Sequence, residues 1–336
     1  MTLKFAISGA GYIAKIHAQA IKNLGGEVAV LVERFSEKGK AFAAQYGAQQ
    51  YATIEDALHA GGFEALIVAT PNYLHHPQTM AALQAGVAVM VEKPMAMDAA
   101  EAGQMCEATA KTGAPLMVAH CWRFDPEVLW LQQQAGRLGK IIRTKGYGVH
   151  THWGPAGWFT QKAYAGGGAL ADMGIHALDT ARFLLGDPQP VSVYARIGTY
   201  YKDIDVDDTG TILVNWDNGA TSYIESGWWQ PHSDGPEAAT QLYGLAGFGQ
   251  LFPTRLEFPD PVAQKLEVSD PGFAFPRPEH CPQSMYDDQL QYFIQCVRSG
   301  QAPLPGGQEG LTNMRVLDAA YLSARTGQVV EIGHLS

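Results

Sequence analysis

The sequence predicts an α/β protein of two domains: an N-terminal doubly wound parallel sheet, and a C-terminal α+β domain with a large, mostly antiparallel open sheet. In the first 121 residues, near-continuous apolar runs alternate with helical patterns, which is typical of a parallel sheet covered on both faces. Later strand-like runs include two that are joined by Asp217-Asn218-Gly219, a turn that favours an antiparallel hairpin. The length of 336 residues suits two domains, which we place at 1–121 and 122–336.

The first domain is expected to contain five strands with helices between them. The strands are predicted at 3–8, 27–32, 64–69, 87–91 and 116–119, and the helices at 13–23, 36–45, 54–59, 77–85 and 99–112. Asp98 and Glu101 have the spacing of a capping box, and Gly113 ends the helix that they begin.

The second domain is expected to begin with a helix at 126–135 and a strand at 141–151. Three consecutive glycines, 166–168, are then followed by a helical pattern that reaches residue 185. Further strands are predicted at 191–201, 209–216, 220–229, 240–245 and 255–258, and helices at 286–298 and 311–325 close the chain.

Composition excludes several classes of protein. With 46% hydrophobic residues the chain is too apolar for disorder, and no apolar run approaches the ~20 residues of a membrane span. The net charge of −10, without a basic run, makes nucleic acid and anionic lipid poor partners. The four cysteines have neither CxxC nor metal-ligand spacing, so reduced thiols are expected. No cleavable leader precedes the first strand, which makes the cytoplasm the expected compartment.

A glycine-rich loop follows the first predicted strand and opens the first helix; it reads Gly9-Ala10-Gly11-Tyr12-Ile13-Ala14. In this position glycines let backbone N–H groups and a helix N-terminus approach a pyrophosphate. Glu33 ends the second strand, at about the ~20-residue distance expected of the acid that binds a ribose 2′-hydroxyl. The alternative is an ordinary tight turn with a surface glutamate. We predict a Rossmann-type dinucleotide site.

Glu33 also bears on the choice of cofactor. A carboxylate accepts hydrogen bonds from the ribose hydroxyls and repels a 2′-phosphate, which favours NAD. Arg34, Lys38 and Lys40 lie just downstream and would offset that repulsion, so NADP stays open.

Two further polar segments follow predicted strands, namely Thr70-Pro71-Asn72 and Glu92-Lys93-Pro94. The carboxyl ends of parallel strands form one sheet edge, where ligands bind in such folds. A lysine that is partly desolvated there, and close to a cation, can donate or accept a proton. The alternative for Lys93 is a surface lysine whose aliphatic stem is buried.

The helical pattern after the three glycines carries Asp172 and His176, four residues apart. On a helix these two side chains lie on one face, where a carboxylate fixes the imidazole tautomer and raises its basicity, as a general base requires. The alternative is a capping Asp with a hydrogen-bonded core His.

Two other chemistries deserve comparison. His150 and His152 share one face of a predicted strand and would complete an N/O metal site with the Asp172–His176 pair. No HxxxH or HExxH pair supports that site, so no metal is expected. A serine hydrolase is set aside because the sequence has no GxSxG elbow.

Aromatic side chains gather in the second domain. Ring faces stack on the C–H faces of sugars, although most such residues are core or subunit-interface residues. Trp153 and Trp158, which precede the helix of Asp172 and His176, are the expected substrate contacts.

Together these motifs resemble the glucose–fructose oxidoreductase/inositol dehydrogenase/rhizopine-catabolism (Gfo/Idh/MocA) family of oxidoreductases. The resemblance spans residues 3 to about 185 and rests on residues 9–14, Thr70-Pro71-Asn72 with His75, Glu92-Lys93-Pro94, Arg123-Phe124-Asp125-Pro126, and Gly167-Gly168 leading to Asp172-Met173-Gly174-Ile175-His176. Ala14 stands where the family pattern has glycine and Glu33 where it often has aspartate. Neither departure puts the activity in doubt.

The resemblance implies a role for each matching residue. Lys93 matches the catalytic lysine, with a cis bond to Pro94, and the Asp172–His176 pair matches the one that binds the reacting hydroxyl and moves its proton. The cofactor is expected to contact Gly9, Gly11, Tyr12, Ile13, Ala14, Glu33, Arg34, Thr70, Pro71, Asn72, His75, Glu92 and Lys93. The substrate is expected to contact Lys93, Arg123, Trp153, Trp158, Asp172 and His176. The sheet of the second domain is expected to pack against a partner subunit, in a homodimer or homotetramer.

The implied reaction is hydride transfer between NAD or NADP and a secondary alcohol of a sugar, an inositol-like polyol or a sugar derivative. Two alternatives stay open: an NAD-dependent glycosidase of the same family that acts by transient oxidation, and a non-catalytic dinucleotide-binding regulatory protein. The intact set of Lys93, Asp172 and His176 argues against the second, because a sensor has no use for proton transfer.

Overall fold

The computed structural model describes residues 3–231, 236–260 and 262–334. Its chain forms two compact units, the first from the residues up to 121 together with 282–314, and the second from 122–281 together with the residues from 315 onward. The predicted boundary at residue 121 coincides with the first change of unit. The prediction that every later residue belongs to the second domain differs from the structure, because 282–314 belong to the first unit.

Side-chain contacts explain why this later segment joins the first unit. Helix α9 (Gln283–Ser299) packs along α1 (Tyr12–Asn23): Tyr286 lies edge-on to His17 with ring centroids 6.0 Å apart. In addition, the Nδ2 of Asn23 donates to the Oδ2 of Asp287 at 2.8 Å. No local sequence pattern predicts packing between segments so far apart in the chain.

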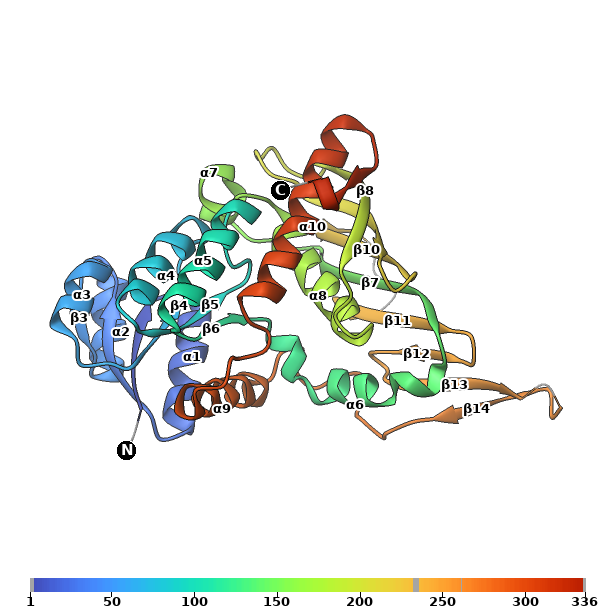
Figure 1. Cartoon of the computed structure of the whole chain (residues 1–336), viewed down its shortest axis with the longest axis horizontal. Helices are drawn as coiled ribbons and strands as arrows, with labels where there is room; N and C mark the ends of the chain where they lie inside the picture. The colour runs from blue at the N-terminus through green and yellow to red at the C-terminus, as the bar shows by residue number, and fades with distance from the viewer. Residues whose placement is uncertain (1–2, 232–235, 261, 335–336) are drawn as a thin grey trace. The chain divides into compact units, whose positions relative to one another are not determined.

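The first unit contains a six-stranded parallel sheet in the order β3-β2-β1-β4-β5-β6 (Figure 1). Its strands are β1 Lys4–Ser8, β2 Glu27–Val32, β3 Gln49–Tyr51, β4 Ala65–Val68, β5 Ala88–Glu92 and β6 Leu116–Ala119. Its other helices are α2 Glu37–Tyr46, α3 Ile54–Ala60, α4 His75–Gln84, α5 Ala99–Thr112 and the start of α10 (Gly307–Thr326). The strand order reverses between β1 and β4, so the loops after these two strands border the crevice where ligands bind in open α/β sheets.

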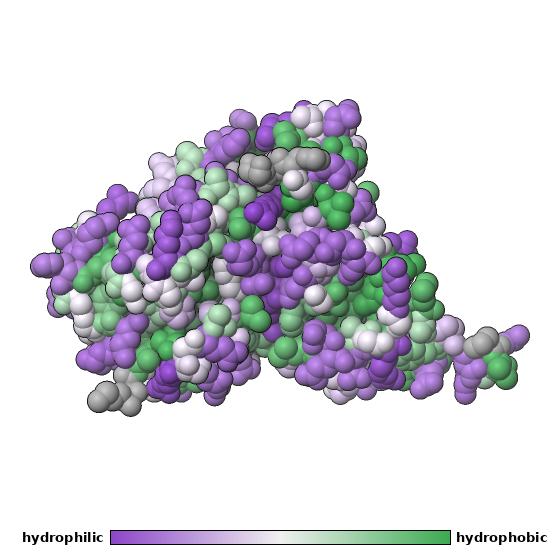
Figure 2. Space-filling model, in the orientation of Figure 1, coloured by the Kyte–Doolittle hydropathy of each residue, from purple (hydrophilic) through white to green (hydrophobic). Residues whose placement is uncertain are grey.

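Local sequence accounts for most of these elements. The strands β4 and β5 are buried throughout, as a sheet covered on both faces requires. The side chains of Ser36, Thr53 and Asp98 cap α2, α3 and α5 by accepting backbone N–H bonds. The predicted doubly wound domain is confirmed, and hydrophilic side chains gather over its outer helices (Figure 2). The strand β3 has only three residues, too few for a periodic pattern to be recognised.

The second unit contains a nine-stranded sheet in the order β14-β13-β12-β11-β7-β10-β9-β8-β15, with only the β7–β10 pair parallel among the described strands. Its strands are β7 Ile141–Thr151, β8 Pro190–Gly198, β9 Thr209–Trp216, β10 Thr221–Gln230, β11 Ala238–Gly244, β12 Phe248–Gln250, β13 Arg255–Asp260, β14 Lys265–Ser269 and β15 Val330–Glu331. The strand β9 alternates buried with more exposed residues, so one face of the sheet is covered and the other is open. The predicted mostly antiparallel open sheet is confirmed.

The helices of the second unit are α6 Pro126–Gln134, α7 Lys162–Ala165, α8 Ile175–Leu184 and the end of α10. The helical pattern after the three glycines begins with a π-helical segment, η5 (Leu170–Gly174), which continues into α8. The sequence predicts a helix here but not its π-helical turn, because the same pattern of apolar residues is compatible with an α-helix and with a π-helix.

Asp207 holds the start of this helix. Its carboxylate accepts from the backbone N–H groups of Gly168 at 2.7 Å and Leu170 at 2.8 Å, and from the hydroxyl of Tyr321 at 2.9 Å. Burial raises the pKa of Asp207, although these hydrogen bonds oppose that rise. The glycine is needed because a Cβ on Gly168 would lie 1.9 Å from the carbonyl oxygen of Asp207.

Two further properties follow from the described residues. The four cysteines, Cys106, Cys121, Cys281 and Cys296, are thiols that form no disulfide with one another. Among the helices of the described ranges, none combines the length and the apolar character that a bilayer crossing needs.

Gly168→Ala should destabilise the protein by about 1–3 kcal/mol or more, because its methyl group collides with backbone that cannot move aside cheaply. Gly136→Ala is the matched control within the same unit, since a Cβ there meets nothing within 4 Å and the φ angle is not positive. Thermal unfolding followed by calorimetry measures both. Equal melting temperatures for the two variants would contradict this steric account.

Candidate active site

The loop after β1 fits the pyrophosphate of a dinucleotide. Gly9 has a φ of +95°, and a Cβ there would lie 2.4 Å from the carbonyl oxygen of Ala69, so glycine alone lets the loop meet the end of β4. Gly11 is the N-cap residue of α1, where no side chain of the described ranges caps the helix and its first turn holds no acidic residue. The N–H groups at the start of α1 are therefore open to an anionic group.

The other residues of this loop differ in exposure. Tyr12 is 81% exposed at the first position of α1, whereas Ala14 is fully buried, as the position that packs helix on strand requires. The ammonium of Lys38 lies beside the loop, with Nζ 4.0 Å from where a Cβ of Gly11 would be. The sequence identifies Lys38 only as a cation downstream of Glu33, whereas the structure places it where it would attract a phosphate.

Glu33 follows β2 directly, and neighbouring residues hold its backbone. Its N–H donates to the carbonyl oxygen of Tyr51 at 3.0 Å, and its own carbonyl accepts from the Nε2 of Gln50 at 3.0 Å. A Cβ on Gly39 would lie 2.8 Å from the Cγ of Glu33, so this glycine makes room for the glutamate. Arg34 is exposed beside it.

His75 links the loops after β4 and β5. Its Nε2 lies 2.9 Å from the carbonyl oxygen of Thr70, and its Nδ1 lies 2.8 Å from that of Pro94. Burial lowers the pKa of His75, although these two backbone contacts oppose the shift. His75 is 1% exposed and Asn72 is 6% exposed, so both lie within these loops rather than on their surface.

Lys93 follows the buried strand β5, and its bond to Pro94 is cis, as the family resemblance implied. Behind it, the Oε1 of Glu92 lies 2.6 Å from the Nε2 of His17, and its Oε2 accepts the Lys93 N–H at 3.2 Å. Burial alone would raise the pKa of Glu92, but the hydrogen bond and charge of His17, with the charge of Lys93, outweigh burial and lower it. The ionised glutamate thus connects Lys93 to α1, the helix that begins at the glycine loop.

In the second unit, glycines bring η5 against the sheet. A Cβ on Gly148 of β7 would lie 2.3 Å from the carbonyl oxygen of Met173, and one on Gly174 would lie 2.9 Å from the Cβ of Ser226 in β10. These close approaches fix Asp172 over strands β7 and β10.

The partners of Asp172 include residues of both strands. Its Oδ2 accepts from the Nε1 of Trp228 at 3.1 Å and lies 3.9 Å from the Nε2 of His150. His176 follows in the first turn of α8, where its ring lies 6.1 Å from that of Trp122. The second unit therefore gathers a carboxylate, two imidazoles and indole rings around one helix start.

Sequence reasoning did not identify Glu237, counted Trp228 only among the aromatic residues of the second domain, and considered His150 only as a metal ligand. Trp228 lies on the buried face of β10, and the period-two pattern 222, 224, 226, 228 was the available signal. Glu237 comes just before β11 with no motif around it, and only its contacts reveal it: its Oε2 lies 3.3 Å from the Nδ1 of His150. These contacts join segments far apart in the chain, which no local spacing records.

The two tryptophans predicted as substrate contacts lie in different surroundings. Trp153 is 49% exposed and stacks on His150, with ring centroids 3.6 Å apart. Trp158 is half-buried and stacks on Phe159 at 3.8 Å. Only Trp153 joins the group around Asp172 through contacts that the structure records here.

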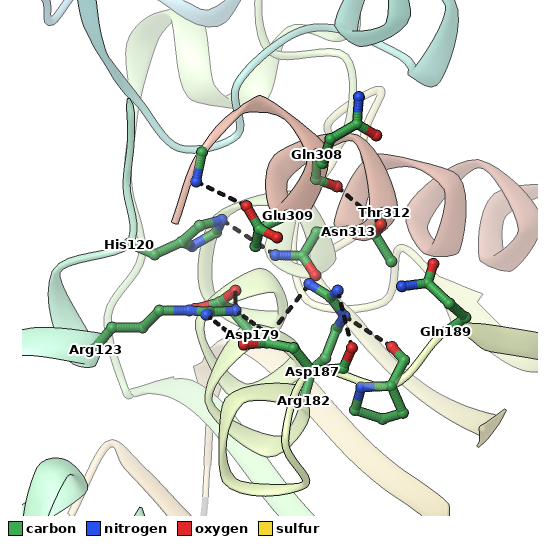
Figure 3. A network of polar contacts seen from close by, with 12 residues as sticks. His120, Arg123, Asp179, Arg182, Asp187, Gln189, Gln308, Glu309, Thr312 and Asn313 are labelled. Atoms are coloured by element: carbon green, nitrogen blue, oxygen red, sulfur yellow. Dashed lines mark hydrogen bonds and ion pairs between the residues drawn. The ribbon is translucent and has the colours of Figure 1, made fainter. Parts of the chain in front are cut away.

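Arg123, the third predicted substrate contact, is buried in an ion-pair network of its own unit (Figure 3). Its Nε and Nη2 each donate to Asp179 at 2.8 Å, and its Nη1 and Nη2 donate to Asp187 at 3.0 and 2.7 Å. Burial alone would lower the pKa of Arg123, but the two carboxylates raise it above its ordinary value. We infer a structural role, because these donors already face carboxylates on both sides.

The metal-site alternative would combine His150 and His152 with the Asp172–His176 pair. His150 does lie near Asp172, whereas His152 is exposed and has a φ of +62°. Within the described ranges, no group of three or more His, Cys, Asp or Glu side chains is arranged to hold a metal ion.

Three models of known protein families match successive parts of this chain. Residues 3–120 match the family model "Oxidoreductase family, NAD-binding Rossmann fold", residues 132–248 match "GFO/IDH/MocA C-terminal domain", and residues 270–332 match "Oxidoreductase family, C-terminal alpha/beta domain". Together the three models cover most of the chain.

Curated relatives and solved structures agree with this match. The chain is 29% identical to a D-apiose dehydrogenase of Paraburkholderia graminis, over 99% of this chain and 90% of that protein. It is 27% identical to an inositol 2-dehydrogenase of Rhizobium meliloti, over 99% and 100%. An aldose-aldose oxidoreductase of Caulobacter crescentus, solved with glycerol, is 29% identical, with a TM-score of 0.82 over 98% of this chain and 100% of that one. The chain therefore belongs to the Gfo/Idh/MocA family of oxidoreductases and carries its NAD-binding Rossmann fold.

Proposed function

We propose that this NAD(P)-dependent oxidoreductase transfers a hydride between nicotinamide and a secondary alcohol of a cyclic sugar, an inositol-like polyol or a sugar derivative. One observation carries the proposal: Lys93 directly follows a buried strand, β5, at the same sheet edge as the glycine loop. The named relatives, which include an inositol 2-dehydrogenase and a D-glucoside 3-dehydrogenase, support a carbohydrate alcohol as the substrate.

The residues of the first unit would hold the cofactor. The N–H groups at the start of α1 would bind its pyrophosphate, with Lys38 beside them, and Glu33 would accept hydrogen bonds from the adenosine ribose. When bound, the nicotinamide supplies the hydride chemistry. The protein supplies position and electrostatics.

The proton of the reacting hydroxyl is moved by protein groups. Lys93 donates a hydrogen bond to the hydroxyl oxygen and stabilises the negative charge that develops on it. His176 removes the hydroxyl proton, and Asp172 favours the protonated imidazole by its charge. Trp153 offers an apolar ring face to the substrate's C–H groups.

The open face of the nine-stranded sheet is the proposed subunit interface. Exposed or half-exposed side chains of neighbouring strands form rows on it, for example Leu213, Tyr223 and Lys145 in direct register. Mixed aromatic and polar rows of this kind suit an interface between subunits of a homodimer or homotetramer. The four cysteines form no disulfide with one another, which also fits the proposed cytoplasmic location.

A screen identifies the substrate. Myo-inositol, scyllo-inositol, D-apiose, D-xylose and methyl glucosides are incubated with NAD or NADP, and absorbance of the reduced nicotinamide is followed. Sustained reduction with at least one of them is expected. Release of a free sugar from the glucosides without net reduction would identify the glycosidase instead, and cofactor binding without any turnover would identify the regulatory protein.

Lys93→Ala should lower kcat by about 10²–10⁴ while the Kd of the cofactor stays unchanged, because a proton-handling group is lost but no phosphate contact is. Cofactor fluorescence titration and steady-state kinetics measure the two quantities. Lys111→Ala, which removes an exposed lysine paired with Glu107 on α5, is the control. Near-normal turnover of the Lys93 variant would remove this lysine from the mechanism.

Glu33→Gln should raise kcat/KM for NADP relative to NAD by about tenfold or more, because a like-charge contact with the 2′-phosphate costs more than the ~1.4 kcal/mol that a factor of ten represents. The ratio of kcat/KM for the two cofactors is measured. Glu37→Gln, at an exposed glutamate paired with Lys40, serves as the control. An unchanged ratio would show that Glu33 does not face the ribose.

A further inference from the structure

Three ionisable side chains form a row in the second unit. The Nε2 of His150 lies 3.9 Å from the Oδ2 of Asp172, and its Nδ1 lies 3.3 Å from the Oε2 of Glu237. The side chains are 15% exposed at Asp172, 12% at His150 and 28% at Glu237. The row therefore leads from the proposed reaction centre to its most exposed member, Glu237.

The imidazole of His150 is held on its edge and on its face. The Oε1 of Glu237 accepts from the Nε1 of Trp153 at 2.6 Å and from the backbone N–H of Thr151 at 3.2 Å. The indole of Trp153 stacks on the imidazole at an angle of 27° between ring planes. The carbonyl oxygen of Glu237 also accepts from the N–H of Val149 at 2.8 Å, which fixes β7 and β11 together here.

This geometry selects one tautomer. An ionised Glu237 can only accept, so the Nδ1 of His150 carries the hydrogen that faces it. The lone pair of Nε2 is then directed to the Asp172 side of the ring. A proton that arrives at Nε2 can be matched by one that leaves from Nδ1, which is the action of a relay.

We propose that His150 and Glu237 form the proton exit of the active site, an inference that rests on the proposed function. Oxidation of a secondary alcohol gives up one hydride to the cofactor and one proton to the Asp172–His176 pair. Asp172 passes that proton to the Nε2 of His150, the Nδ1 proton moves to Glu237, and Glu237 releases it to water. This step requires the 3.9 Å separation between Asp172 and His150 to shorten to hydrogen-bond distance when substrate binds.

Other charged groups face the same region. Burial lowers the pKa of His280, and the charges of Glu237, Arg277 and His150 also act on this imidazole. The positive charge of Arg277 is compensated, since its guanidinium pairs with Asp125. Glu237 thus remains the acceptor toward which His150 delivers its proton.

The test compares proton release with hydride transfer in a single turnover. Stopped-flow absorbance follows the reduced nicotinamide, and a pH indicator in weak buffer follows the proton, with the fastest substrate of the screen. In the wild type the two signals should coincide. In His150→Asn and Glu237→Gln, proton release should lag by about 10- to 100-fold, and added imidazole should restore it in the His150 variant.

His152→Asn is the control, since it makes the same substitution two residues along, at an exposed position. Its two signals should coincide as in the wild type. Coincident signals in His150→Asn would overturn the relay. So would an equal loss of both signals that imidazole does not restore, because that result describes a structural role.

A second measurement needs no substrate and separates this inference from the proposed function. Histidine-selective NMR of the full chain gives the titration midpoint of His150, assigned by the signal missing in His150→Asn. The midpoint should fall in Glu237→Gln and stay unchanged in His152→Asn. An unchanged midpoint in Glu237→Gln would overturn the relay even if the enzyme oxidises sugars, whereas a screen without turnover would overturn only the proposed function.

Discussion

Close approach of glycine backbone to a neighbouring carbonyl oxygen is the constraint on which the candidate site residues of each unit depend. Gly9 meets Ala69 in the first unit, and Gly148 and Gly168 meet Met173 and Asp207 in the second. At each point a Cβ would lie within 2.4 Å of the oxygen, so no other residue fits without a backbone shift. The first contact places an uncapped helix start beside the end of β4, and the other two place Asp172 against the sheet.

Around these contacts, several carboxylates bind backbone N–H groups or cationic side chains of the protein itself. Glu92 connects Lys93 to α1, Asp207 holds the start of η5, and Asp179 and Asp187 bind Arg123. Each pairs with backbone N–H groups or with a cation, as buried charges must. These carboxylates therefore have a structural role, since they hold the backbone and side chains around the proposed catalytic residues in place.

The sequence predicted the parallel sheet, the glycine loop and the position of Lys93, because these depend on local patterns: buried strands, capped helices and a motif at a strand end. It could not predict that Arg123 is occupied by Asp179 and Asp187, since both partners lie more than fifty residues away. The contacts of Trp228 with Asp172 and of Glu237 with His150 could not be predicted for the same reason. The helix around Asp172 was predicted, but its π turn was not, because a π turn leaves no signature in the apolar pattern.

The strand β14 ends the nine-stranded sheet on one side, so the backbone groups of its outer edge have no neighbouring strand among the described residues. Leu266 and Val268 alternate there with Lys265 and Glu267, all outside the core. An exposed edge strand with apolar side chains can pair with strands of other molecules, and charged side chains on such a strand commonly prevent this pairing. Replacing Lys265 and Glu267 with neutral residues would therefore leave an exposed apolar edge strand, which is the kind of strand that promotes aggregation.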